Sequence, residues 1–186
     1  AAFDQIEISQ GPVDILINNA AVYPQLDILE ETAQSLMQTV NINLGGTIAC
    51  SRAALTAMVK RGHGRIIDVA SFADIAPIPT SAAYSISKGA QRIFSRALHA
   101  DLADRFPNIV LSTWLPGMLA TDMGLVNGLD PKTAAKWGAS LALLTDRSLN
   151  GVVFERDTEM LPHQSFKRRM VNRLLGKRAK PRRLTP

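Results

Sequence analysis

Residues 13–18 read VDILIN and lead into Asn-Ala-Ala at residues 19–21. A short apolar run with β-branched members, followed by small or turn-prone residues, is typical of a buried strand that ends in a loop. Two similar runs follow along the chain, RIIDVA at residues 65–70 and IVLSTW at residues 109–114. These three stretches predict strands of one buried sheet.

The stretches between these strands carry helical patterns. Apolar side chains recur at the spacing of a helix from about residue 30 to residue 60 and again over residues 82–105, where Pro107 ends the pattern. Asp130 before Pro131 is typical of a helix start, with Asp as the N-cap and Pro in the first turn. This third helix is expected to run to about residue 144.

The order of these patterns decides the fold class. A fourth short strand is expected at residues 151–154, GVVF, so strands and helices alternate along the chain. This alternation predicts an α/β fold with a doubly wound parallel sheet and helices on both faces. Ligands of such sheets bind at the carboxyl ends of the strands. We predict one domain over residues 1–155 and a basic tail over residues 156–186.

The formal net charge of +5 is unevenly distributed over the 186 residues. Residues 1–166 hold 12 basic and 16 acidic side chains, whereas residues 167–186 hold 9 basic and no acidic ones. Phe166, Met170 and Leu174 are spaced as on a short amphipathic helix. Such a basic helix could lie on an anionic membrane surface, bind nucleic acid or an acidic partner, or pack on the domain.

Cysteine and histidine usage narrows the class of protein further. Cys50 is the only cysteine, which excludes a disulfide within the chain and favours a reducing, cytoplasmic location. His63, His99 and His163 are scattered, so we predict no metal site. No apolar run approaches the roughly 18 residues that a membrane span needs, and the first residues lack the pattern of a secretory signal.

Tyr84 and Lys88 are four residues apart on the predicted helix 82–105 and therefore share one face. A nearby ammonium favours the phenolate, so we expect Lys88 to lower the pKa of Tyr84. A phenol with a lowered pKa can act as general acid and base in the interconversion of a carbonyl and an alcohol. Taken alone, however, this spacing also occurs by chance on amphipathic helices.

Two further polar residues are candidates for the same site. Ser71 follows a predicted strand and could donate a hydrogen bond to a substrate oxygen held beside Tyr84. Alternatively, it satisfies backbone groups after the strand. Asn43 lies inside a predicted helix, where Asn is a poor helix former, and could hold a water or a neighbouring carbonyl. Alternatively, it faces solvent.

Five motifs together resemble the short-chain dehydrogenase/reductase family, in its shorter cytosolic branch. The resemblance is close over about residues 11–123 and looser over 130–155. It implies a Rossmann-like fold, a nicotinamide cofactor (NAD or NADP) and a homodimer or homotetramer. The motifs, in the order typical of the family, are Asn18-Asn19-Ala20-Ala21, Asn43-Leu44-Gly45-Gly46, Gly64-Arg65-Ile66-Ile67 leading to Ser71, Tyr84-Ser85-Ile86-Ser87-Lys88, and Pro116-Gly117-Met118-Leu119-Ala120-Thr121.

The resemblance implies a role for each matching residue. Tyr84 would be the catalytic acid/base, Lys88 would lower its pKa and hold the nicotinamide ribose, and Ser71 would orient the substrate oxygen. Asn43 would anchor a water that links Lys88 to solvent. The residues that would line the cofactor, besides Tyr84 and Lys88, are Asn19, Ala20, Ala21, Pro116, Gly117, Met118, Leu119 and Thr121.

One departure from the family concerns the cofactor. The glycine-rich turn that holds the pyrophosphate in such folds does not occur in these residues. By resemblance, the first strands and the residue that selects NAD or NADP are missing. We expect either that the chain belongs to a longer protein or that it is a truncated gene product. In the latter case the strand 13–18 would present an open apolar edge.

These features predict an NAD(P)-dependent alcohol dehydrogenase or carbonyl reductase. The loop 73–81 and the segment 118–130 are rich in apolar residues, which favours a small apolar substrate. Asp74 is the exception, and it is expected to cap its loop. Two alternatives stay open: a non-catalytic cofactor-binding or scaffold protein that keeps the fold, and an epimerase or dehydratase acting through transient oxidation. The apolar residues expected at the substrate are Ile75, Pro77, Ile78, Pro79, Met118, Leu119, Met123, Leu125 and Val126.

Overall fold

A computed structural model describes residues 2–161 and 180–185 of the chain. Its centre is a five-stranded sheet in the order β1-β2-β3-β4-β5. The first four strands are parallel, and the last pairs antiparallel with β4. The strands are β1 (Ile15–Asn18), β2 (Gly64–Val69), β3 (Ile109–Leu115), β4 (Val152–Glu155) and β5 (Thr158–Met160).

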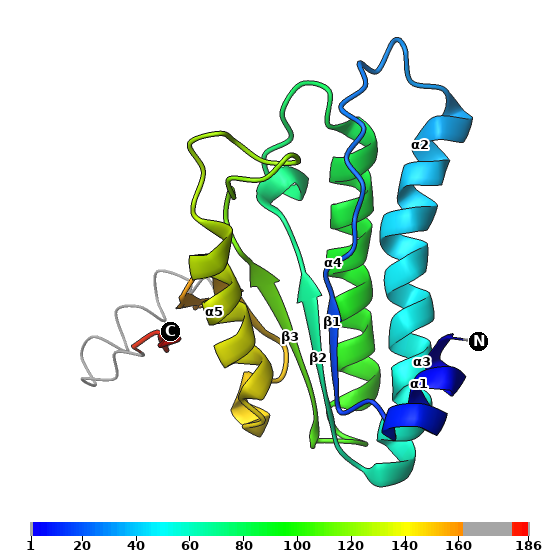
Figure 1. The fold of residues 1–186 in the computed structure, drawn as a ribbon, viewed down its shortest axis with the longest axis vertical. Helices are drawn as coiled ribbons and strands as arrows, with labels where there is room; N and C mark the ends of the chain where they lie inside the picture. The colour runs from blue at the N-terminus through cyan, green and yellow to red at the C-terminus, as the bar shows by residue number, and fades with distance from the viewer. Residues whose placement is uncertain (1, 162–179, 186) are drawn as a thin grey trace, which may run out of the picture.

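Helices cover both faces of the sheet. In Figure 1, α5 lies on one side of the strands, and α3 and α4 lie on the other. A single turn of π-helix, η1, joins α2 to α3 without a break in the chain direction. The helices are α1 (Ala2–Gln10), α2 (Ala33–Val40), η1 (Asn41–Gly45), α3 (Gly46–Arg61), α4 (Ala82–Leu102) and α5 (Pro131–Leu143), with short 3₁₀ turns η2 (Phe72–Asp74) and η3 (Arg147–Leu149).

The alternation of side chains along the strands supplies two hydrophobic cores. In β2, Ile66 faces the core shared with α3 and α4, whereas Ile67 faces the core beneath α5. Close approach of α5 depends on Gly138, because a Cβ there would lie 2.9 Å from the Trp114 ring. Every residue of β2 and β3 is buried, as expected of central parallel strands.

The predicted fold class is confirmed, with local differences. The long helix expected from residue 30 begins at Ala33 instead, because Thr32 and Ser35 form a capping box. It is also divided by the π-helical turn, which apolar spacing does not reveal. The predicted helix 82–105 ends at Leu102.

The carboxyl-terminal part of the described chain joins the sheet. β5 was not predicted, and it pairs with β4 within the region expected to be a tail. Thr158 pairs in turn with Arg183, and Leu184 is buried in the core beneath α5. The expected basic amphipathic helix falls on residues 162–179, outside the described residues.

The opposite end of the described sheet is more exposed. β1 is the outer strand there, and its Ile15 and Ile17 side chains are 38% and 45% exposed. Both apolar side chains are therefore accessible in the part of the chain that the structure describes. Whether this edge is open in the whole protein stays a prediction that depends on the residues that precede the chain.

Candidate active site

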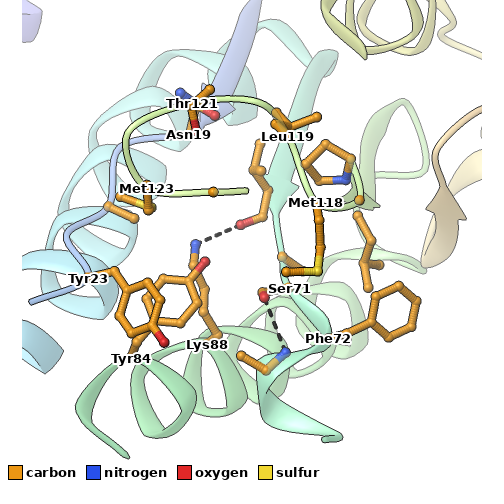
Figure 2. Close-up of a pocket in the computed structure, with 18 of the residues that line it drawn as sticks. Asn19, Tyr23, Ser71, Phe72, Tyr84, Lys88, Met118, Leu119, Thr121 and Met123 are labelled. Carbon is orange, nitrogen blue, oxygen red and sulfur yellow. Dashed lines mark hydrogen bonds between the residues drawn. The ribbon is translucent and has the colours of Figure 1, made fainter. Parts of the chain in front are cut away.

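A cavity of about 530 Å³ opens at the carboxyl ends of β1, β2 and β3. Backbone segments leaving these three strands form its rim, and α4 forms one wall (Figure 2). Its lining is mainly apolar, with a few hydroxyl, amide and ammonium groups. The lining residues are Asn19, Ala20, Ala21, Tyr23, Val69, Ala70, Ser71, Phe72, Ala73, Ala76, Ile78, Tyr84, Lys88, Leu115, Pro116, Gly117, Met118, Leu119, Thr121, Met123 and Gly124.

Tyr84 and Lys88 share one face of α4 and both line the cavity. The Lys88 ammonium nitrogen lies 5.8 Å from the centre of the Tyr84 ring. The sequence prediction that the two side chains face one cleft agrees with this placement. They can therefore act on the same bound molecule.

Lys88 is almost fully buried, and its ammonium is held by two neutral acceptors. Nζ donates to the Val69 carbonyl oxygen at 2.8 Å and to Gln91 Oε1 at 3.0 Å. Burial lowers the pKa of Lys88 from its ordinary value of 10.5 to about 8, and the charge of nearby Asp68 acts in the opposite direction. Lys88 thus remains mostly charged at neutral pH and has one N–H beyond these two contacts.

The expected lowering of the Tyr84 pKa is wrong for the chain as described. Burial raises the pKa of Tyr84, a hydrogen bond with Ser71 lowers it by less, and Tyr23 raises it further. The ammonium of Lys88 lies over the ring and is engaged by other acceptors, so it does not offset the burial. Tyr84 is therefore a protonated phenol at neutral pH, which is a proton donor.

Ser71 lies where β2 passes into the loop above the cavity. Its hydroxyl accepts a hydrogen bond from the Ala73 backbone N–H at 3.1 Å, which starts the turn η2. Arg92 of α4 binds the Ser71 carbonyl oxygen at 3.2 Å and pairs with Asp74 at 2.7 Å. Ser71 thus satisfies a backbone group after the strand and reaches Tyr84, while its role toward a substrate oxygen stays a prediction.

Asn43 lies in the π-helical turn and is 1% exposed. Its side chain binds both backbone polar atoms of Val22, accepting from N at 2.8 Å and donating to O at 3.0 Å. It also donates to Ser87 Oγ at 2.9 Å. Asn43 therefore joins the loop after β1 to α4 and is not the solvent-facing residue of the alternative. It is not among the residues that line the cavity.

All ten residues predicted to contact a cofactor line the cavity. Those after β3 follow a turn in which Gly117 has φ of +89°. A side chain there would strain the backbone and would bring a Cβ to within 3.0 Å of Arg156 Nε. The turn at Gly117 directs the segment with Met118 and Thr121 over the cavity (Figure 2).

The apolar residues predicted for the substrate divide into two groups. Four of them line the cavity: Ile78, Met118, Leu119 and Met123. The other five are not in its lining: Ile75, Pro77, Pro79, Leu125 and Val126. Of these, Val126 is 97% exposed. Asp74 pairs with Arg92, which ties the loop to α4.

Sequence reasoning missed Tyr23 at this site. Its ring stacks on that of Tyr84 with a centroid distance of 4.7 Å and an interplanar angle of 27° (Figure 2). The contact buries one face of the catalytic candidate. A Tyr two residues after the Asn-Ala-Ala motif gives no such signal by itself, because the stacking depends on the path of the loop.

Asp68 and Gln91 were also missed, and both are buried polar residues behind the cavity. Asp68 in β2 accepts hydrogen bonds from Asn18 Nδ2 at 2.7 Å and from the Ser95 hydroxyl. Burial raises the pKa of Asp68, while those hydrogen bonds and the charge of Lys88 lower it. A carboxylate that follows two isoleucines within the strand RIIDVA was the available signal.

The sequence profile described as short chain dehydrogenase matches residues 1–129. The chain belongs to the short-chain dehydrogenase/reductase family. It is 34% identical over 113 residues to dehydrogenase/reductase SDR family member 7 of Mus musculus, covering 61% of this chain and 33% of the mouse protein. It is 32% identical over 127 residues to carbonyl reductase (NADPH) 2 of Sus scrofa, covering 68% of this chain and 51% of the pig protein.

Solved structures of this family share the fold. A gluconate 5-dehydrogenase from Burkholderia cenocepacia, in complex with NADP and tartrate, superimposes with a TM-score of 0.71 at 26% identity. The match covers 83% of this chain and 67% of that one. The chain spans a third to about a half of the length of the two curated relatives named above.

Across residues 2–161 and 180–185, His, Cys, Asp and Glu side chains form no group of three or more that could hold a metal ion. None of the helices in this part of the chain is both long and apolar enough to cross a membrane.

Proposed function

We propose that this chain carries the proton-transfer and substrate-binding part of an NAD(P)-dependent alcohol dehydrogenase or carbonyl reductase. The observation that carries the proposal is the placement of Tyr84, Ser71 and Lys88 on one cavity at the carboxyl ends of the central strands. That is where doubly wound sheets bind their ligands. Membership of the family supports the same chemistry.

Tyr84 would donate its phenolic proton to a carbonyl oxygen in the reducing direction and accept it back in the oxidising direction. Its raised pKa means that the donor form is present at neutral pH. Ser71 would hold the same oxygen by a second hydrogen bond and stabilise the charge that develops there. Ser71 caps the turn η2 and Tyr84 lies on α4, so local hydrogen bonding holds the backbone of both residues.

The cavity residues fit a nicotinamide cofactor in part. Lys88 offers one ammonium N–H beyond its two contacts within the described residues, which suits a ribose hydroxyl. Asn19, the two alanines after it and the segment from Pro116 to Thr121 would line the nicotinamide half. When bound, the cofactor supplies the hydride, and these residues position it. The gluconate 5-dehydrogenase is in complex with NADP, whereas a 4-hydroxyisoleucine dehydrogenase of the same fold is complexed with NADH, so the choice of cofactor stays open.

The apolar lining supports an apolar carbonyl or alcohol as substrate. Phe72, Ile78 and Met123 reach the cavity from two different loops. Asp74, which lies in the loop after Ser71 but outside the lining, pairs with Arg92 at 2.7 Å. A small ketone with apolar substituents would therefore bury its apolar surface against a lining of the same character.

The test is turnover by the intact protein that carries this chain. NADH or NADPH oxidation would be followed with a panel of apolar ketones and matched keto acids. We expect apolar ketones to be preferred and Tyr84→Phe to lower kcat by roughly 10²–10⁴-fold. Tyr23→Phe is the matched control, since it keeps the stacked ring and removes a hydroxyl with no proposed proton role.

The same assay decides between the proposal and its rivals. Equal turnover by Tyr84→Phe and the wild type would exclude Tyr84 as the acid. Cofactor binding without turnover of any ketone or alcohol would favour the non-catalytic alternative. Product formation without net oxidation of the cofactor would favour an epimerase or dehydratase.

A further inference from the structure

Lys88 is joined to the turn of Asn43 by a continuous path of side-chain hydrogen bonds. Lys88 Nζ donates to Gln91 Oε1 at 3.0 Å, and Gln91 Nε2 donates to Thr47 Oγ1 at 3.1 Å. The Thr47 hydroxyl donates to the Asn43 carbonyl oxygen at 2.8 Å. All four residues are buried, with exposed fractions of 5% or less.

The direction of every bond in this path is fixed by chemistry. An ammonium only donates, so the Gln91 amide must present its oxygen to Lys88 and its NH₂ to Thr47. A backbone carbonyl only accepts, so the Thr47 hydroxyl donates its hydrogen bond to the Asn43 carbonyl oxygen. The same hydroxyl accepts a hydrogen bond from the Gln91 amide through a lone pair. Donors and acceptors can therefore be assigned along this path in only one way.

Three elements meet at this path. Lys88 and Gln91 are three residues apart on α4 and share a face, Thr47 lies on α3, and Asn43 lies in the π-helical turn. The π-helical turn displaces the helix that contains it, and such turns are frequent at functional sites. Here the turn places the Asn43 side chain on Val22 and its carbonyl toward Thr47.

We propose that Gln91, oriented by Thr47, is a positioning residue that fixes the Lys88 ammonium at the cavity. The resemblance to the family places a water between Lys88 and the Asn43 turn, and the Gln91–Thr47 pair connects the same two points with protein atoms. This role rests on the proposed function, because Lys88 must face a cofactor and Tyr84 for its position to matter. The contacts themselves do not depend on that function.

The Gln91 carboxamide can hold Lys88 in position but cannot relay a proton. A Gln side chain donates and accepts hydrogen bonds but does not ionise, so it cannot pass a proton from Lys88 to Thr47. Proton exchange of Lys88 is therefore directed to its cavity side. With Val69 O and Gln91 Oε1 fixed as two acceptors, the third N–H has a defined direction.

The pKa of Lys88 should be sensitive to its hydrogen bond with Gln91. The titratable groups around the ammonium are Tyr84 on its own helix, Asp68 from β2, and Tyr23, which stacks on Tyr84 from the loop after β1. None of them makes a direct hydrogen bond to Nζ among the described contacts, so Gln91 is the one side-chain acceptor there. Removing it would remove a hydrogen bond that favours the charged form.

The experiment is an NMR titration of the Lys88 ammonium in the full chain without cofactor, with the signal assigned through Lys88→Arg. Gln91→Met keeps the length and removes the acceptor, and we expect the Lys88 pKa to fall by at least about one unit. Gln91→Glu should raise it by placing a carboxylate at the same atom. Thr47→Val should lower it by less, and Gln34→Met on the exposed side of α2 should leave it unchanged.

An unchanged Lys88 pKa in Gln91→Met would overturn the proposal, as would a fall in Gln91→Glu. Should Gln91→Met fail to fold, Gln91→Glu and Thr47→Val still give opposite signs that a merely structural role would not produce. Because no cofactor or turnover is involved, this result is independent of the ketone assay. If turnover is also found, the high-pH limb of kcat should move with the Lys88 pKa.

Discussion

The two walls of the cavity are built in different ways. The helical wall consists of Tyr84 and Lys88 on α4 together with Asn43 behind them, and its polar groups are buried and hydrogen-bonded to several elements. The loop wall consists of residues 72–80 and 116–128, whose apolar side chains are largely exposed, with Met118 at 55%. The residues proposed for proton transfer are thus attached mainly to the packed core, whereas those proposed to contact the substrate lie mainly on loops.

This difference has a physical reason. A proton donor must keep a fixed orientation, and a buried network with all its hydrogen bonds made provides it. Substitution of a residue in such a network is strongly destabilising, because it leaves buried polar groups without partners. A substrate pocket needs only apolar surface of suitable shape, which loops provide with few internal contacts. The loop wall is held mainly by a backbone ladder between Leu119 and Leu129 and by the Arg92–Asp74 pair.

The largest effect on stability is expected from a substitution of Asn43 in the helical wall. Asn43→Ala removes three side-chain hydrogen bonds and leaves the backbone groups of Val22 and the Ser87 hydroxyl short of partners. We expect a loss of about 3 kcal/mol in the free energy of unfolding, measured by urea denaturation. Asn41→Ala, two residues away and exposed, should change it by less than about 0.5 kcal/mol.

A smaller effect concerns the buried charge of Lys88. Folded Lys88 loses its proton near pH 8, whereas the unfolded chain keeps it until about 10.5, so the unfolded state binds more protons between these values. Stability should therefore rise with pH, by about 1.5 kcal/mol between pH 8 and 9.5. Urea unfolding at several pH values would show it, and the rise should vanish in Lys88→Met.

The smallest effect is expected at the loop wall. Met123→Ala should lower kcat/KM for apolar ketones by roughly tenfold, because it removes apolar surface from the cavity. Its free energy of unfolding should change little. Val126→Ala in the same loop, 97% exposed and outside the lining, is the control. Equal losses for both variants would show that the loop wall does not select substrate through its lining.

The sequence was informative where one residue type has one role. Alternation of strand and helix patterns predicted the parallel sheet, and Asp130-Pro131 predicted the start of α5. The spacing of Tyr84 and Lys88 predicted their shared face. Their electrostatics could not be predicted from spacing, because the pKa of Tyr84 depends on burial and on the acceptors that engage Lys88.

Features that depend on how elements meet were not predictable from the sequence. The stacking of Tyr23 on Tyr84 requires the path of the loop after β1, which Asn43 fixes through Val22. The π-helical turn arises within a segment whose apolar spacing is that of an ordinary helix. The role of Gln91 depends on its hydrogen bond to Thr47 of α3, which the sequence of α4 alone does not indicate.

Tyr84 can act as the proposed donor only if it holds its proton at neutral pH. The chain has two tyrosines, so ¹³C labelling of the phenol carbons gives two signals, and Tyr84→Phe assigns them. We expect Tyr84 to titrate above its ordinary pKa near 10 and Ser71→Ala to raise that pKa further, since Ser71 lowers it. A Tyr84 signal already in the phenolate form at pH 7, or one that does not respond to Ser71→Ala, would contradict this assignment.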